Sequence, residues 1–436
     1  MFFLIIVVLS TLILLICRMR TNMVTKKILI MYLIWTLTIL GFSTFNMFGL
    51  YEVSINIYCM WIINILLVTF SVLILSKKKG EEILQKQKDI IERIENSKII
   101  FYASVVISLL LLYYRVRYNK VIENLPLEYI RMARFDKLFN SGIESIFFDY
   151  ILINSLRILL MFTAILIVNG KYKNRIVVLG LISLVIYTMI GYGRMIIFEF
   201  VIYLIISYLT FNCRKIKIKL KKIIQWIGLG VILIFAGAAI TVIRLKGVKS
   251  LNLDTIFEYG ILEQIKQIYV YFTGGFRTLD SFVKNGFYAL NKMTLGRLTF
   301  GGFEDLLGLV LNNIGYNFET INSLVGPITQ SNVQIGEQVY INAFYTCLMN
   351  YYGDMGYAGI IIYPILHGIL IAYSINNYIK KKSLLSFVLL SYVTMNLLSS
   401  IYRWQYQFGQ YTLLMIILLG INFIFENKRK NRRYLE

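Results

Sequence analysis

Long apolar runs alternate with short polar segments along almost the whole chain. A helix needs about 20 mostly apolar residues to cross a bilayer, because each residue adds about 1.5 Å of length. Eleven runs approach that length, and they cover residues 1–17, 28–44, 55–76, 99–114, 146–169, 176–192, 195–211, 224–243, 357–376, 384–402 and 408–425. The pattern therefore predicts an all-α polytopic membrane protein with about 11 transmembrane helices.

One polar segment, residues 244–356, is far longer than the others and contains no apolar run long enough to cross. It separates an N-terminal transmembrane region at 1–243, with about eight helices, from a C-terminal region at 357–436, with about three helices and a basic tail. Between Ile261 and Phe272, apolar residues recur at helical spacing opposite polar ones. This spacing predicts an interfacial helix that lies flat on the membrane.

Glycines gather in the same long segment, at Gly274, Gly275, Gly296, Gly301 and Gly302. Glycine is favoured where the chain turns or where backbone approaches another group closely. The cluster therefore predicts turns at these positions.

The chain is more apolar and more basic than a soluble domain. Hydrophobic residues make up 58% of it and the mean hydropathy is +0.68, against about 45–50% apolar residues in soluble proteins. Of the 45 Lys and Arg residues, 28 lie in alternate loops, at 18–27, 77–98, 171–175, 214–222, 380–382 and 428–433. Because basic loops face the cytoplasm, the net charge of +22 indicates topology and gives no reason to expect nucleic acid as a partner. It predicts an external N-terminus, a cytoplasmic C-terminus and an external segment at 244–356.

A short polar signature closes the long segment and runs directly into an apolar run. It reads INAFYTCLMNYYGDMGYAG from Ile341 to Gly359. Its notable members are Asn342, Thr346, Tyr351, Tyr352, Gly353, Asp354, Gly356 and Gly359. With Gly-Tyr-Gly-Arg at Gly191 to Arg194 and the long late loop, this signature resembles the Wzy-type polymerases of O-antigen and capsule repeat units.

The resemblance implies a membrane glycosyltransferase of the broad GT-C kind. Such an enzyme works on the outer face of the bacterial cytoplasmic membrane. It transfers a growing glycan from undecaprenyl pyrophosphate onto the non-reducing end of a new lipid-linked repeat unit. Its partners are the lipid-linked donor and acceptor and membrane lipid, with a chain-length regulator and a flippase as further candidates. Two rivals stay open: a transferase similar to the O-antigen ligases, with the same donor and another acceptor, and a lipid-linked oligosaccharide flippase.

A pyrophosphate leaving group must be neutralised by a metal ion or by fixed cations. The four cysteines, Cys17, Cys59, Cys213 and Cys347, form no CxxC pair, which excludes a zinc site by spacing. The predicted outer segments also contain no Asp-x-Asp pair and no cluster of histidine with carboxylates. We therefore expect a metal-independent enzyme without a cofactor, in which arginine binds phosphate oxygens with its planar fork.

Four arginines are the candidates for the pyrophosphate: Arg194, Arg244, Arg277 and Arg403. Arg194 is the leading one and is expected to be catalytic, because two glycines precede it at the start of a predicted span, where helix N–H groups can also bind phosphate. Its alternative role is a headgroup anchor. The alternatives for the other three are an ordinary surface charge and, for Arg403, an anchor in the aromatic belt.

Asp354 is the candidate for removing the proton of the acceptor hydroxyl or for orienting a sugar, and its alternative role is the N-cap of the next helix. The resemblance adds Asn342, Thr346 and Tyr352 as residues that position the substrate. His367, the only histidine, falls in the middle of a predicted span and is expected to be a packing residue rather than a general base.

Two charged residues fall inside predicted spans, Arg157 and Glu199. Charges at that depth are costly, so they are expected to have a partner. Arg157 is expected to pair with Glu199 or with Asp149. In the long segment, Arg297 and the neighbours Glu304 and Asp305 are expected to be solvated loop charges.

Overall fold

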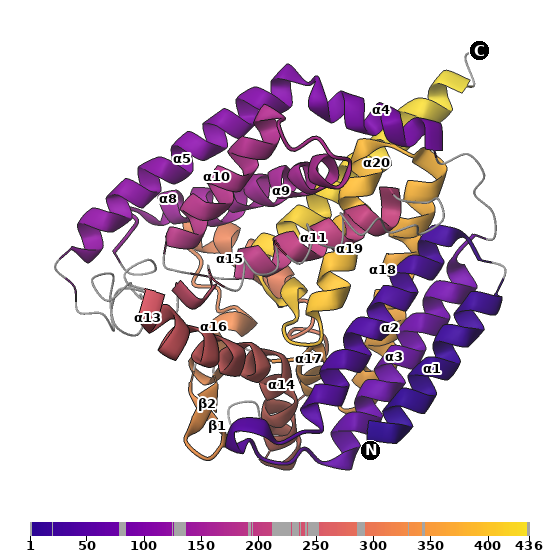
Figure 1. The fold of residues 1–436 in the computed structure, drawn as a ribbon, viewed down its shortest axis with the longest axis vertical. Helices are drawn as coiled ribbons and strands as arrows, with labels where there is room; N and C mark the ends of the chain where they lie inside the picture. Colours follow the sequence, from indigo (N-terminus) through magenta and orange to yellow (C-terminus); the bar gives the residue numbers. More distant parts are fainter. Residues whose placement is uncertain are drawn as a thin grey trace. The chain divides into compact units, whose positions relative to one another are not determined.

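The computed structural model describes residues 2–19, 21–77, 84–123, 137–190, 195–211, 253–285, 293–329, 331–341 and 345–433, together with a few isolated positions between them. These parts are helical apart from one antiparallel hairpin, β1 (Val333–Gly336) and β2 (Val339–Ile341). Figure 1 shows the arrangement of the elements. The predicted all-α class is confirmed for the described residues.

Among the described residues, five helices are long and apolar enough to cross a membrane: α2 (Met23–Ser43), α3 (Ile55–Leu75), α5 (Lys98–Ile122), the continuous helix Gly142–Val168, and α18 (Tyr357–Lys381). Five shorter apolar helical stretches accompany them: Ile5–Arg18 in α1 (Phe2–Arg18), α10 (Arg175–Met189), α11 (Met195–Phe211), α19 (Leu384–Ser399), and Gly409–Ile424 in α20 (Gly409–Arg433). All ten coincide with expected spans. The eleventh expected span, 224–243, lies mostly outside the described residues. The chain is thus a helical protein with the apolar helices of a multi-pass membrane protein.

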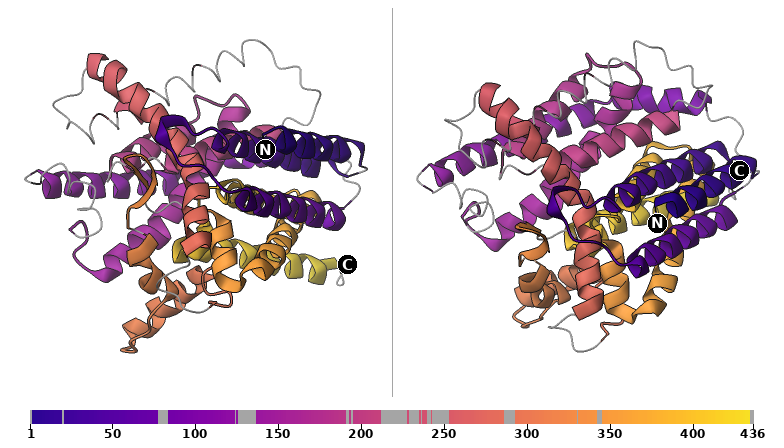
Figure 2. Two further views of the ribbon diagram at one scale, coloured as in Figure 1. Left: turned by 90° about the horizontal axis from the view of Figure 1, so that it is seen from below. Right: turned by 60° about the horizontal axis from the view of Figure 1, so that its bottom comes forward.

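The chain divides into two compact units, and the first comprises residues 1–90 and 270–436. In this unit α18 packs against α3, α17 (Cys347–Met355) and α19, while α1 lies beside α2. Figures 1 and 2 show α1, α2 and α3 side by side. Every residue of α19 from Ser386 onwards is buried. Because α19 is buried on all sides, it lies at the centre of this unit.

The second unit comprises residues 91–269. Here α10 packs against α5 and α9 (Ile153–Val168), and α11 packs against α9. The helix that ends with α9 begins with α8 (Gly142–Ile146) and the π-helical turn η2 (Phe147–Leu152). The remaining elements among the described residues, from both units, are η1 (Met47–Gly49), α4 (Leu84–Glu95), α13 (Leu253–Thr255), η4 (Ile256–Ile261), α14 (Leu262–Asn285), α15 (Gly301–Asn313), α16 (Ile321–Thr329) and η5 (Gln405–Gln407).

The helix expected from Ile261 is confirmed as α14, and its placement on the membrane surface stays a prediction. The turn expected at Gly274 and Gly275 is wrong, because both glycines lie inside α14. Gly274 instead allows close packing. A Cβ atom there would lie 2.7 Å from Cδ1 of Ile341 in the hairpin. Gly296 does lie in a turn, with a φ of +100°.

Candidate functional site

The signature folds as a tight junction between α17 and α18. Gly356 joins the two helices with φ of 60° and ψ of −138°, a conformation that is open to glycine and costly for other residues. At Gly359, a Cβ atom would lie 1.9 Å from the carbonyl oxygen of Tyr351. The two glycines therefore let the start of α18 contact the backbone of α17. The N-cap residue of α18 is Gly356, so the alternative role of Asp354 as that N-cap is wrong.

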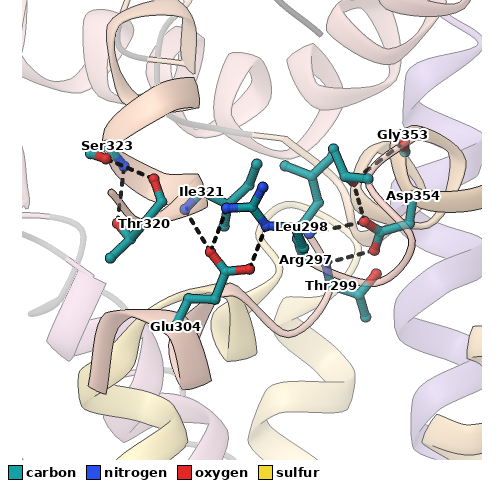
Figure 3. Close-up of polar contacts among 10 residues, drawn as sticks. Arg297, Leu298, Thr299, Glu304, Thr320, Ile321, Ser323, Gly353 and Asp354 are labelled. Carbon is teal, nitrogen blue, oxygen red and sulfur yellow. Dashed lines mark hydrogen bonds and ion pairs between the residues drawn. The ribbon is translucent and has the colours of Figure 1, made fainter. Parts of the chain in front are cut away.

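Asp354 is fully buried at the end of α17. Its carboxylate accepts hydrogen bonds from the backbone N–H of Leu298 at 2.9 Å, from that of Thr299 at 2.8 Å, and from the hydroxyl of Thr294. Figure 3 shows the carboxylate facing Leu298 and Thr299. Asp354 therefore fixes the turn at 294–299. A group that accepts a proton from a substrate needs an accessible oxygen, so this geometry favours a positioning role over the predicted proton transfer.

A cavity of about 90 Å³ lies beside this turn. It is lined by Leu298, Thr329, Tyr345, Met349, Asn350, Arg403, Gln407 and Phe408. These residues come from the turn, from α16, from α17, from the position two residues before α17, and from the connection between α19 and α20. We call it the Arg403 cavity.

Arg403 supplies the charge of the Arg403 cavity. Its guanidinium carbon lies 4.1 Å from the ring centroid of Phe408, within the range of a cation–π contact. Stacking on a ring orients the guanidinium plane while its N–H donors stay at the edge. Asn350 adds a side-chain amide, which donates to the Leu298 carbonyl at 2.8 Å and to Oε1 of Gln407 at 3.0 Å. The cavity thus combines one oriented cation with two amide side chains.

Hydrogen bonds fix the walls of the Arg403 cavity. Trp404 Nε1 donates to the Thr299 carbonyl at 2.7 Å, and the Cys347 N–H donates to the Ser400 carbonyl at 2.9 Å. The carboxylate of Asp305 on α15 accepts from the Gly409 N–H at 3.0 Å and from the Asn322 amide at 2.8 Å. Burial raises the pKa of Asp305, and these two donors oppose the rise. The cavity is therefore held in shape before any ligand binds.

Glu304 ties the turn to α16. Both carboxylate oxygens of Glu304 accept hydrogen bonds from the Arg297 guanidinium, at 2.7 and 3.1 Å. One of them also accepts a hydrogen bond from the Ile321 N–H at 2.8 Å (Figure 3). The hydrogen bond with Glu304 is the main cause of a raised pKa at Arg297. The expectation that Glu304 and Asp305 are solvated loop charges is wrong, because both carboxylates hold backbone N–H groups. Arg297 itself remains exposed.

Arg277 is not among the residues that line the Arg403 cavity, and its guanidinium is engaged within the protein. Its buried guanidinium donates to the carbonyls of Tyr51 at 2.6 Å and Thr273 at 3.1 Å, and to Asn46 Oδ1 at 3.2 Å. These groups take up all three nitrogens of the fork. One helical turn further, Asp280 accepts from the N–H and hydroxyl of Ser54. Arg277 therefore fixes the connection between α2 and α3 instead of offering its fork to a pyrophosphate.

Arg194, Arg244 and Asn342 lie outside the described residues, so their predicted roles stay predictions. Thr346 is the N-cap of α17 and is fully buried. Tyr352 packs edge-on against the rings of Phe282 and Tyr357.

Arg403 is the one lining residue of the Arg403 cavity that the sequence analysis singled out. The residues that it missed include Tyr345, Asn350 and Gln407. For Asn350 a signal did exist, because it lies one helical turn before Asp354 and hence on the same face of α17. For Gln407 the local sequence offers no such spacing. Gln407 lies in the connection between α19 and α20, and the fold of that connection places its side chain at the cavity.

The expected pair of Arg157 and Glu199 is confirmed in the second unit. Arg157 Nε lies 2.9 Å from Glu199 Oε2, and both side chains are buried. Asn154 accepts a further hydrogen bond from Arg157 at 2.8 Å. His367, in the first unit, is buried with its ring edge-on to Trp404 at 5.1 Å, which is the packing role expected for it.

No family model, no curated protein and no solved structure matches the chain. The class that its composition and helices define is a helical membrane protein. Within the part of the chain that the structure describes, no three His, Cys, Asp or Glu residues lie close enough together to hold a metal ion.

Proposed function

We propose that this chain polymerises lipid-linked oligosaccharide repeat units on the outer face of a bacterial cytoplasmic membrane, as Wzy-type polymerases do. In this proposal it is a metal-independent glycosyltransferase of the GT-C kind with 11 spans. Its N-terminus lies outside and its C-terminus in the cytoplasm. The donor and the acceptor are both glycans on undecaprenyl pyrophosphate.

The observation that carries the proposal is the position of Arg403 beside the signature helix α17. A guanidinium that is stacked on Phe408 suits phosphate oxygens. The amides of Asn350 and Gln407 beside it hydrogen-bond to each other, which fixes that wall of the cavity. Pockets for whole ligands have about 300–1,000 Å³, whereas this cavity has about 90 Å³. It therefore suits one group of the substrate, and a phosphate of the leaving pyrophosphate is the group that needs a cation.

In the reaction, a hydroxyl of the acceptor sugar attacks the anomeric carbon of the donor glycan. A new C–O bond forms while the bond from that carbon to the pyrophosphate breaks. The pyrophosphate leaves with the bonding electrons, and the proton of the attacking hydroxyl is released to water. Arg403 stabilises the charge that develops on the leaving group. Asp354 keeps the turn at 294–299 against the cavity. Arg194 and Arg244 remain candidates for binding the rest of the pyrophosphate.

The proposal is tested by deleting the gene and separating the surface polysaccharide on a gel. Single capped repeat units in place of the polymer support a polymerase. Uncapped polymer that stays on its lipid carrier indicates the ligase-like transferase instead. Repeat units that accumulate inside the cell indicate a flippase.

We expect turnover on purified lipid-linked repeat units to survive EDTA. In this proposal arginine side chains neutralise the charge of the pyrophosphate, so the enzyme does not need to bind a divalent metal ion. Product length with and without chelator is the measurement. Loss of activity on chelation that Mg²⁺ reverses contradicts the arginine mechanism.

A further inference from the structure

Helix α15 turns its polar groups towards the protein. Asp305 and Glu304 accept hydrogen bonds from the backbone of Gly409 and Ile321. Gly302 lies against the connection before α20, since a Cβ atom there would be 2.7 Å from the Tyr406 carbonyl oxygen. The inward face of α15 is therefore made of carboxylates and glycine.

The opposite face of α15 is apolar and exposed. Phe303, Leu307, Val310 and Ile314 are exposed by 44, 49, 61 and 64%. Their spacing of 4, 3 and 4 residues places them in one stripe along the helix and the residue that follows it. A helix on the surface of a water-soluble protein shows the reverse arrangement, with its apolar stripe turned inward.

The exposed ring of Phe300 connects this stripe to a candidate membrane span, α18. The ring of Phe300 packs edge-on against the rings of Phe303 and Tyr363 of α18. The ring centroids are 6.3 Å and 5.9 Å apart, respectively. On α18, a second exposed stripe repeats the same spacing of 4, 3 and 4 residues: Ile362, Leu366, Ile369 and Tyr373, exposed by 39 to 45%. Helix α15 also packs against α20, another apolar helix.

We infer that α15 lies in the boundary of the bilayer, with its apolar stripe covered by the acyl chains of membrane lipid. A helix of 13 residues is about 20 Å long and cannot cross the hydrocarbon core of about 30 Å. The C-terminal end of α15 and the segment after it carry Asn312, Asn313 and Asn317, all of them exposed, which suits the headgroup region. An interfacial helix has this combination of an apolar face and a polar end.

The inference changes the assignment of residues 301–313, which belong to an extramembrane loop by sequence. Asp305 on α15 also holds the backbone at Gly409, next to the Arg403 cavity. In this inference α15 therefore lies between that wall of the cavity and the lipid. The inference does not depend on the proposed reaction.

The test is spin-label accessibility in the full-length protein reconstituted into phospholipid vesicles. Labels are placed at Leu307→Cys and Val310→Cys, and at Asn317→Cys as the polar control. The background carries Cys17→Ser, Cys59→Ser and Cys213→Ser and keeps Cys347, which is buried. Collision with oxygen reports acyl chains, and collision with a water-soluble nickel chelate reports water.

At positions 307 and 310 we expect oxygen to relax the spin label more strongly than the nickel chelate does. At position 317 we expect the nickel chelate to relax the label more strongly than oxygen. Greater relaxation by nickel at 307 and 310 means that water covers the stripe, which overturns the inference. Weak relaxation by both reagents at these two sites means that protein covers it, which overturns the inference equally. Two labelled positions guard against the loss of one variant through misfolding.

Discussion

The surroundings of each arginine decide what its guanidinium can bind. Arg277 and Arg403 both follow glycine or aromatic residues in polar stretches, so the sequence does not distinguish them. In the structure, Arg277 is buried and donates to backbone carbonyls, whereas Arg403 lines a cavity and stacks on Phe408. Of these two described arginines, Arg403 is the one that lines a cavity.

We expect Arg403→Lys to abolish polymer formation in a deletion strain although the protein reaches normal membrane levels. Lysine keeps the charge but loses the planar fork and the stacking on Phe408. A contact to the charge of a transition state contributes about 3–4 kcal/mol, or roughly a hundred- to a thousandfold in rate. Arg297→Lys is the matched control, because Arg297 is an exposed arginine that pairs with Glu304. Normal chain-length ladders from Arg403→Lys would remove Arg403 from the site.

Asp354 offers a second residue-scale prediction. We expect Asp354→Asn to lower the melting temperature of the purified protein, since an amide cannot accept all the hydrogen bonds of the carboxylate. Hydrogen bonds to a charged group contribute about 1.5–3 kcal/mol each. Thr294→Ala, which removes one of the donors, should have a smaller effect of the same sign. An unchanged melting temperature with complete loss of turnover would restore the catalytic role of Asp354.

Individual roles of charged side chains were the least predictable feature of the sequence. The partner of Asp354 is a turn about 55 residues earlier in the chain, and no local spacing reveals such a contact. Arg157 and Glu199 were paired correctly because a buried charge inside a span requires a partner and few were available.

At the scale of elements, the junction of α17 and α18 accounts for the glycines of the signature. Gly356 permits the reversal and Gly359 permits contact between the helices. Since α17 also carries Asn350, the angle of this junction places part of the Arg403 cavity.

We expect Gly359→Ala to destabilise the protein by about 1–3 kcal/mol, the usual cost of forcing extra volume into a packed site. The new methyl group would lie 1.9 Å from the Tyr351 carbonyl oxygen, so one helix must shift. Gly420→Ala on α20 is the matched control, because nothing lies within 4 Å of a Cβ atom there. Thermal unfolding in detergent measures both variants. Equal stability of the two would show that the junction tolerates movement.

Apolar helices were predictable because the length of an apolar run is a local property. Ten of the expected spans coincide with helices for this reason. The polar inward face of α15 was not predictable, since its partners at Gly409 and Asn322 come from other parts of the chain. The role of Gly274 was not predictable either. The sequence indicates a turn there, but Gly274 lies inside α14 and packs against the hairpin.

At the scale of the whole molecule, the distribution of basic residues predicts the orientation. Reporter fusions at Lys78, Lys217 and Arg429 should give a cytoplasmic signal, and a fusion at Lys292 should give an external one. The reason is the excess of basic residues in the alternate loops. An external signal at Lys217 would reverse that part of the topology and move Arg194 to the other face.

The central claim is that this chain joins lipid-linked repeat units. Purified protein in phospholipid vesicles, supplied with one defined undecaprenyl pyrophosphate-linked repeat unit, tests it most directly, with product length as the measurement. We predict a ladder of products that differ by one repeat unit and that remain on the lipid carrier, and we predict no ladder from the Arg403→Lys variant. Substrate that stays a single repeat unit with wild-type protein, in vesicles where the protein is folded and correctly oriented, would contradict the claim.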